Sequence, residues 1–343
     1  MNQVEECLIG VTLGKATIFR NLTMFPLQAN NPWEADYDLL DEALADGSAR
    51  VTEVSESGSV PELRFECHGE KPVLLLDGEE LVGAKQNRIL NLTILASAGK
   101  SVVIPVSCVE AGRWQSRSRE FTSASRAHFA EGRAKKAESV SYRMYADGSR
   151  VADQSQVWDD ISLKSERMHA YSQSQASEAL YDTHRGSLDA FRSAFSSTEA
   201  DSGAVFAING EVVGMDLFDC PATFSKLMPK IVESYALDAL DALDSRQQEA
   251  GPEDGKSTEQ VEAFMDSVAK APFMSLKAIG EGEDLRLRGN NLSGGALYAN
   301  GRIIHLCAFQ LRNPNGRNNG AEESRERRTA RLASLHRRRH SRD

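Results

Sequence analysis

Short apolar runs separated by Gly, Pro and Asn turns dominate the first third of the chain. Such runs occupy residues 16–27, 49–54, 62–69, 71–78, 88–96 and 100–109. Apolar segments of this length between turn residues are typical of strands, and such short connections join antiparallel neighbours. The pattern predicts a mainly β region over residues 16–114, interrupted by one short helix at 35–47.

The apolar residues take helical spacing between residues 117 and 196, where Ala, Ser, Glu, Arg and Lys become common. This spacing predicts three helices, near Ser123–Tyr145, near Asp153–His169 with its aspartate as N-cap, and near Ser177–Phe195. One side of the first helix is basic, because Arg126, Arg133, Lys136 and Arg143 recur near multiples of 3.6. That face is either solvated or covers an anionic site.

Strand patterns return after residue 203, in an α/β hairpin region that we place at 203–311. Asn209-Gly210 and Asn300-Gly301 each separate two apolar runs, which indicates hairpins with type I′ turns. Helices are expected at 222–243, where Pro229 would introduce a kink, and at 258–270. LLLDGEELVGA near the start resembles both hairpins, through either an old duplication or ordinary hairpin chemistry.

Together these elements predict an α+β fold. Mainly antiparallel sheets come from the N- and C-terminal thirds, with a helical middle region, in a single domain over residues 14–311. After that the composition becomes rich in Arg and low in complexity, so residues 312–343 are expected to form a disordered tail.

The net charge of the chain changes sign at the same boundary. This distribution limits the classes of partner that we expect. The net charge is −10, but residues 312–343 carry ten Arg against four acids, so the remainder carries −16. An acidic body does not favour nucleic-acid binding, except weakly through the tail. No apolar run approaches the ~20 residues of a membrane span, and the N-terminus lacks a signal-peptide pattern, so we expect a cytoplasmic protein without a membrane partner.

The five cysteines are scattered without a CxxC pair, which indicates free thiols in a reducing compartment rather than a zinc site or disulfide framework. Neither GxGxxG nor GxxxxGK[ST] occurs. We therefore expect no metal and no cofactor. The sequence does not indicate an oligomeric state.

The densest group of polar residues that could hold a ligand lies between Asp77 and Trp114. Four long polar residues, Lys85, Gln86, Asn87 and Arg88, follow a flexible Gly-Ala pair and precede a strand. Basic and amide side chains together bind phosphate or carboxylate groups. The predicted ligand-binding residues are Lys85, Gln86, Asn87, Arg88, Glu110, Arg113 and Trp114. Alternatively, the four residues cap strand ends and pair with Glu79 or Glu80.

Catalytic chemistry has weaker signals. Glu80, Glu110 and Asp216 are the candidates for a general base in a hydrolase. Cys108 ends an apolar strand and could act as a nucleophile if His305 or His68 served as its base, although a core cysteine is the simpler interpretation. Asp219 could join Asp216 in an acid/base pair or cap the following helix.

Several segments in order resemble one bacterial family. They are NLTMFPL, EVSESGSVPEL, LLLDGEELVGAKQNRILN, VIPVSCVEAGRW, GMDLFD and SYALDAL. The chain resembles the ARG and rhodanese-phosphatase-superfamily-associated protein domain (ARPP) family from about residue 14 to 309. The name implies association with ADP-ribosylglycohydrolase and phosphatase-type partners, but the resemblance implies no particular activity.

The function expected from the sequence is binding of a small anionic ligand, nucleotide or ADP-ribose-like, around the GAKQNR segment. The ADP-ribose part rests on the family name alone. One alternative is a hydrolase with a Glu or Asp general base. Another is a non-catalytic interaction module that uses the basic tail. Whether the protein is an enzyme is left open.

Overall fold

The structure is a computed structural model that describes residues 2–55, 58–115, 118–244 and 254–311. Contacts group Met1–Gln310 into one unit. The predicted tail at 312–343 lies outside the described residues.

Nine of the described strands form the largest sheet, which is antiparallel throughout and combines both ends of the chain. Its strands are β1 (Val11–Leu13), β2 (Thr17–Phe19), β3 (Leu22–Ala29), β13 (Asp201–Ile208), β14 (Glu211–Phe218), β15 (Phe273–Lys277), β16 (Glu283–Gly289), β17 (Leu292–Ala299) and β18 (Arg302–Gln310). β3 pairs with β13, and β14 pairs with β18. Residues far apart in sequence thus become neighbours at the centre of the sheet.

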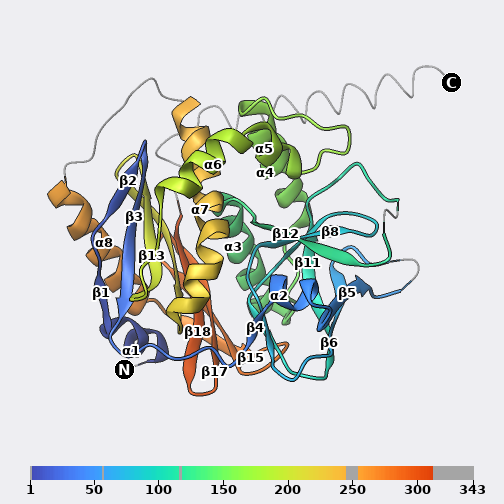
Figure 1. Cartoon of the computed structure of the whole chain (residues 1–343), viewed down its shortest axis with the longest axis horizontal. Coiled ribbons are helices and arrows are strands. Elements are labelled where there is room, and N and C mark those ends of the chain that lie inside the picture. The colour runs from blue at the N-terminus through green and yellow to red at the C-terminus, as the bar shows by residue number, and fades with distance from the viewer. Residues whose placement is uncertain (1, 56–57, 116–117, 245–253, 312–343) are drawn as a thin grey trace. The chain divides into compact units, whose positions relative to one another are not determined.

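Helices cover both faces of this sheet, as Figure 1 shows. The short α1 (Gln3–Ile9) and α8 (Asp254–Ala269) pack together on one face, where an apolar core lies between helices and strands. α3 (Ala130–Asp147) and α7 (Pro221–Asp244) cover the other face. The middle region also contains α4 (Gln154–Arg167), α5 (Glu178–Thr183) and α6 (Arg185–Ala194).

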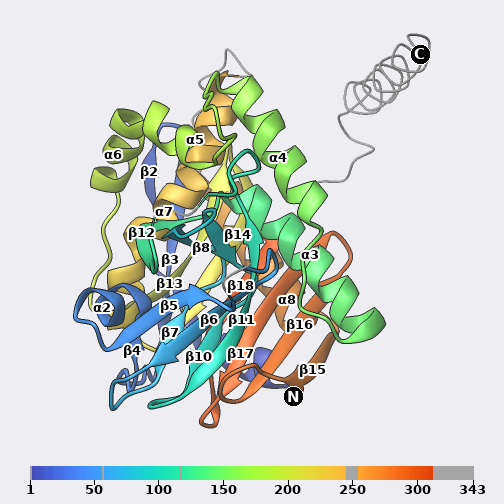
Figure 2. The same ribbon diagram turned by 90° about the vertical axis from the view of Figure 1, so that its right-hand side faces the viewer.

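Two smaller sheets lie at the right of Figure 1 and face the viewer in Figure 2. One contains β5 (Ala49–Glu53), β6 (Glu62–Cys67), β8 (Glu79–Gly83), β9 (Arg88–Leu90), β11 (Ser101–Cys108) and β12 (Phe121–Ala127). The other contains β4 (Asp38–Leu39), β7 (Val73–Leu75) and β10 (Ile94–Ala96), with β4 and β7 parallel. The sheets and the short α2 (Leu40–Ala45) enclose a second apolar core.

The α+β prediction and the origin of the main sheet are confirmed. Both predicted hairpins form, with φ of 53° and 76° at Asn209 and Gly210 and 53° and 78° at Asn300 and Gly301. Asp77-Gly78, however, joins β7 of one small sheet to β8 of the other, so the third similar segment is not a hairpin. Local turn chemistry predicts a reversal but does not determine the pairing of the strands that follow.

Two of the three helices predicted in the middle region differ from the structure. The helix expected from Ser123 begins at Ala130, because residues 121–127 pair with β8 instead. The helix expected at 177–195 is divided into α5 and α6 at His184. The second helix begins as expected, with the Asp153 carboxylate accepting from the backbone N–H groups of residues 155 and 156. The helix at Gln3–Ile9 was not predicted at all.

Candidate functional site

The tight turn between β8 and β9 places most of the predicted polar cluster inside the protein. Ala84 has a positive φ of 36°, which reverses the chain at this point. Gln86, Asn87 and Arg88 follow with exposed fractions of 4%, 0% and 0%. Consecutive polar side chains at this depth require partners for their donors and acceptors.

Most of these partners come from the loop that follows β11. Arg113 donates from Nη2 to the Glu110 carboxylate at 2.6 Å and to Asn87 Oδ1 at 3.1 Å. The same carboxylate accepts the Asn87 N–H at 3.2 Å, and the Glu110 carbonyl accepts from Gln86 Nε2 at 2.9 Å. Arg113 Nη1 also donates to the Ala84 carbonyl at 2.7 Å. Glu110 and Arg113 therefore hold the turn in place.

A third segment, residues 172–177, closes against this loop. Gly112 permits the approach, since a Cβ there would lie 2.9 Å from Ser174 Cα. Glu110 forms an isolated antiparallel bridge with Ala176. The site is thus assembled from three chain segments that pack backbone to backbone.

Arg88 is buried with only part of its guanidinium group hydrogen-bonded. Its Nη1 donates to Gln86 Oε1 at 3.0 Å and to the Asn87 carbonyl at 3.4 Å. Its Nε and Nη2 have no hydrogen-bond acceptor among the described residues. These two nitrogens form the edge that holds carboxylates: in Arg126 they donate to Glu80 at 2.8 and 3.0 Å. The same edge of Arg88 is buried and has no acceptor among the described residues. We call a buried polar group without such a partner open.

Other unmatched polar atoms belong to neighbouring residues. Within the part of the chain that the structure describes, Asn87 Nδ2 and Arg113 Nε are buried donors without an acceptor. Glu53 Oε2 is a buried acceptor without a donor, and the other oxygen of Glu53 accepts the Lys85 N–H at 3.4 Å. The cluster therefore offers four open donors and one open acceptor, which suits a ligand rich in acceptor oxygens.

Trp114 lies at the outer side of the cluster. It is 46% exposed, and its ring centroid is 5.4 Å from Lys85 Nζ and 5.8 Å from Arg88 Cζ. Both cations are within the range in which they are attracted to an aromatic face. The indole therefore lies between the cationic residues and solvent.

The pKa values of Glu110 and Arg88 are both lowered, for different physical reasons. Burial raises the pKa of Glu110, but hydrogen bonds from Arg113 and Ser174 outweigh it, so the pKa is lowered and the carboxylate stays ionised. Burial lowers the pKa of Arg88, although Cys108 and Glu53 partly oppose the shift. The lowered pKa reports a guanidinium whose charge is incompletely compensated.

Cys108 lies beside Arg88 at the end of β11, and Gln154 on α4 fixes its backbone with two hydrogen bonds of 2.8 Å. Burial raises the pKa of its thiol, so the thiol is protonated at neutral pH. Neither proposed base approaches it: His305 contacts Thr93 and Asp216, and the exposed His68 lies near Glu66. The geometry offers no activated nucleophile here.

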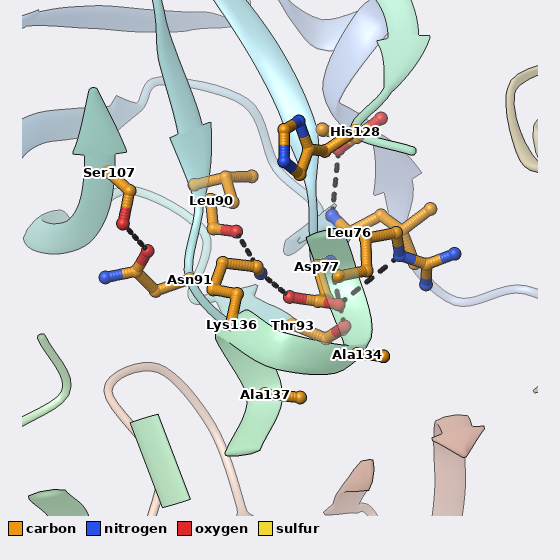
Figure 3. A network of polar contacts seen from close by, with 12 residues as sticks. Leu76, Asp77, Leu90, Asn91, Thr93, Ser107, His128, Ala134, Lys136 and Ala137 are labelled. Atoms are coloured by element: carbon orange, nitrogen blue, oxygen red, sulfur yellow. Dashed lines mark hydrogen bonds and ion pairs between the residues drawn. The ribbon is translucent and has the colours of Figure 1, made fainter. Parts of the chain in front are cut away.

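A second polar region lies between α3, the large sheet and the turn at Asp77. Arg133 donates from Nη1 and Nη2 to Asp216 at 3.1 and 2.6 Å, and its Nε is 3.5 Å from Asp77 Oδ2. Lys136 binds the other oxygen of Asp77 and donates to the Leu90 carbonyl at 2.7 Å (Figure 3). We call Asp77, Arg133, Lys136, Asp216 and His305 the buried ion network.

The network explains the basic side of the predicted helix. Arg133 and Lys136 are 0% and 1% exposed and cover the carboxylates of Asp77 and Asp216, whereas Arg143 on the same helix is exposed. Arg126 belongs to β12 rather than to the helix. Helical periodicity detected the shared face but not its buried partners.

His305 joins the network to Thr93. The Thr93 hydroxyl accepts the Asp77 N–H at 3.0 Å and shares a hydrogen bond of 2.8 Å with His305 Nδ1. His305 Nε2 then donates to Asp216 Oδ1 at 3.2 Å. This hydroxyl–imidazole–carboxylate order resembles a catalytic relay, but Thr93 is only 9% exposed and its hydroxyl is already bound on both sides.

The three candidate general bases do not share a site. Glu80 is bound by both edge nitrogens of Arg126, and Glu110 by Arg113. Asp216 accepts from Arg133, His305 and Tyr235. Each carboxylate is therefore paired in the interior. Pairing of the polar cluster with Glu79 or Glu80 does not occur, because Glu79 binds Lys230 at 2.5 Å.

Asp219, the possible partner of Asp216, is also engaged elsewhere. It accepts from Tyr37 at 2.5 Å and from Arg302 Nε at 2.7 Å.

The cavity beside the buried ion network measures about 10 Å³ and is lined by Asp77, Thr93, Asp284 and Cys307 among others. That volume suits one water molecule and not a substrate.

Sequence reasoning missed two parts of these sites. Glu53 lies at the end of β5, thirty-two residues before Lys85, and no local pattern connects them. Thr93 stands in an apolar segment and meets His305 across 212 residues of sequence.

Among the described residues, no group of three or more His, Cys, Asp or Glu is placed to hold a metal. None of the described helices combines the length and apolar character needed to cross a membrane.

These observations define an α+β protein in which a buried ion network and a second, incompletely paired cationic cluster occupy different places. The chain belongs to the family of ARG and Rhodanese-Phosphatase-superfamily-associated Protein domains, whose family model matches residues 10–309. This match confirms the resemblance seen in the sequence. No curated protein and no solved structure matches the chain.

Proposed function

We propose that the protein binds a small anionic ligand at the cluster formed by Lys85, Gln86, Asn87, Arg88, Glu110, Arg113 and Trp114. The observation that carries the proposal is the open Nε–Nη2 edge of a fully buried Arg88. A buried donor without a partner costs about 1–3 kcal/mol, and more when it is charged. A phosphate or carboxylate oxygen pair would satisfy this edge.

Each neighbouring residue would have a defined role. Arg88 would bind two ligand oxygens, while Asn87 Nδ2 and Arg113 Nε would supply further donors. Glu110 would orient Arg113 through their 2.6 Å ion pair, and Gln86 would orient Arg88 through its Oε1. Trp114 would cover the ligand from the solvent side.

Nucleotide and ADP-ribose-like compounds are the candidate ligands, the second because of the family name alone. A hydrolase using Glu80, Glu110 or Asp216 has less support, because each carboxylate is already held by an arginine. An interaction module acting through the basic tail depends on residues 312–343, which lie outside the described residues. We place the protein in the cytoplasm, which agrees with its five free thiols.

The test is calorimetric titration with inorganic phosphate, AMP and ADP-ribose. Arg88→Lys keeps a positive charge but lacks the two-nitrogen edge, so it should weaken binding at least about tenfold. Arg50→Lys is the matched control, because the Arg50–Glu66 pair is at the surface; it should bind like the unchanged protein. Failure of every anion to bind, or equal affinity in the Arg88→Lys variant, would overturn the proposal.

A further inference from the structure

We infer that the anion is a phosphate group of a ribonucleotide, with its base stacked on Trp114 and its ribose hydroxyls bound by Glu53. This inference rests on the proposed function and specifies its ligand. It depends on two features of the cluster that a bare anion would not need.

The first feature is the exposure of Trp114. An indole that only shielded Arg88 would be expected to pack into the surface, yet Trp114 is 46% exposed while it remains near both cations. An exposed aromatic ring beside phosphate-binding donors provides a stacking surface for a planar base, an arrangement that is common in nucleotide recognition. A ligand that is only a phosphate or carboxylate would leave this surface unused.

The second feature is the open carboxylate oxygen of Glu53. Its Oε2 is buried without a donor among the described residues, although Glu53 acts on the charge of Arg88. A carboxylate facing an anion site weakens the binding of a plain anion. It becomes favourable when the ligand also presents hydroxyl donors, and acidic side chains bind ribose hydroxyls in this way.

The experiment compares the affinities of inorganic phosphate, ribose 5-phosphate, AMP and 2′,3′-dideoxy-AMP for the full chain. We expect AMP to bind at least tenfold more tightly than ribose 5-phosphate. Trp114→Ala should remove the advantage of AMP over ribose 5-phosphate and leave the affinity for ribose 5-phosphate within twofold.

The Glu53→Gln variant should change the affinity for phosphate and the preference for AMP in opposite directions. It should strengthen the binding of inorganic phosphate, because a negative charge is removed, and reduce the preference for AMP over 2′,3′-dideoxy-AMP. A general disturbance of the fold would weaken the binding of inorganic phosphate as well as the binding of AMP. If phosphate binds but AMP binds no more tightly than ribose 5-phosphate, the inference fails while anion binding stands. If no compound binds, both proposals fail.

Discussion

Arg88 and Arg133 are both fully buried guanidinium groups, but their surroundings differ. Arg133 is bound by Asp216 and Asp77, and Coulombic attraction to these carboxylates outweighs burial and raises its pKa. Arg88 faces no carboxylate within hydrogen-bonding distance among the described residues, and burial lowers its pKa. One cation is paired within the folded chain, whereas the other has two nitrogens without an acceptor among the described residues.

Under the proposed function, the buried ion network stabilises the fold, whereas the Arg88 cluster binds the ligand. Buried charges are retained when they are paired, because an unpaired buried charge costs several kcal/mol. The buried ion network meets this condition by itself. The Arg88 cluster does not, and residues that bind ligands commonly destabilise the ligand-free protein. Substitutions in the two places should therefore change stability in different ways.

Arg133→Met should have the largest effect. It leaves the Asp216 carboxylate without its main cationic partner and removes one of the two cations beside Asp77, at a cost of about 3–5 kcal/mol of unfolding free energy. Urea unfolding followed by circular dichroism measures this value. Arg50→Met, at the exposed pair with Glu66, is the control and should leave the midpoint unchanged. A small loss at Arg133 would mean that the network is not a stabilising feature.

Gly78→Ala should have the next largest effect, because Gly78 has a φ of 81° and an added Cβ would lie 3.0 Å from Arg133 Cγ. The backbone strain alone costs about 1–3 kcal/mol. Gly210→Ala, also at positive φ but with open space around it, separates backbone strain from the contact with Arg133. Equal losses in the two variants would show that the contact is unimportant.

The loss of stability at acid pH, the acid limb of the stability curve, tests whether the pKa of Asp216 is lowered in the folded protein. Burial raises the pKa of Asp216, but Arg133 and His305 outweigh it and lower the pKa. A lowered folded-state pKa contributes stability that is present above the unfolded value of about 4 and is lost as pH falls below it. Asp216→Asn should therefore flatten this acid limb in unfolding measurements from pH 6 to pH 2. An unchanged slope would contradict the assignment.

Arg88→Met should have the smallest effect on stability. Removal of an incompletely paired buried cation should leave the unfolding free energy unchanged or raise it by up to ~1 kcal/mol, while ligand binding is lost. Differential scanning calorimetry without ligand measures the first effect, and the titrations described above measure the second. A loss of several kcal/mol would show that Arg88 belongs, like Arg133, to the structural interior.

The fold could be predicted to the extent that it depends on local signals. Asn209-Gly210 and Asn300-Gly301 specify their own turns, and Asp153 caps its helix as the sequence indicates. The strand at Phe121–Ala127 could not be predicted, because its pairing with β8 overrides a composition that favours helix.

The same distinction applies to the sites. Asn87, Glu110 and Arg113 meet because β9 and β11 are paired, with Cys108 opposite Arg88. The sequence prediction grouped them because they fall within one segment, Asp77 to Trp114. Arg133 and Asp216 are 83 residues apart, and only the completed sheet unites them. Long-range pairing also explains why Glu53 was missed as part of the cluster.

The central claim, that the Nε–Nη2 edge of Arg88 is open and holds an anion, can be tested directly by NMR of protein labelled with ¹⁵N-arginine. The Arg88 Nε–H signal is assigned as the one lost in the Arg88→Lys variant. Titration with inorganic phosphate should shift this signal saturably, while the Arg133 signal stays fixed because its acceptors are already bound. An Arg88 signal that does not respond, or an equal response from all arginines, would contradict the claim.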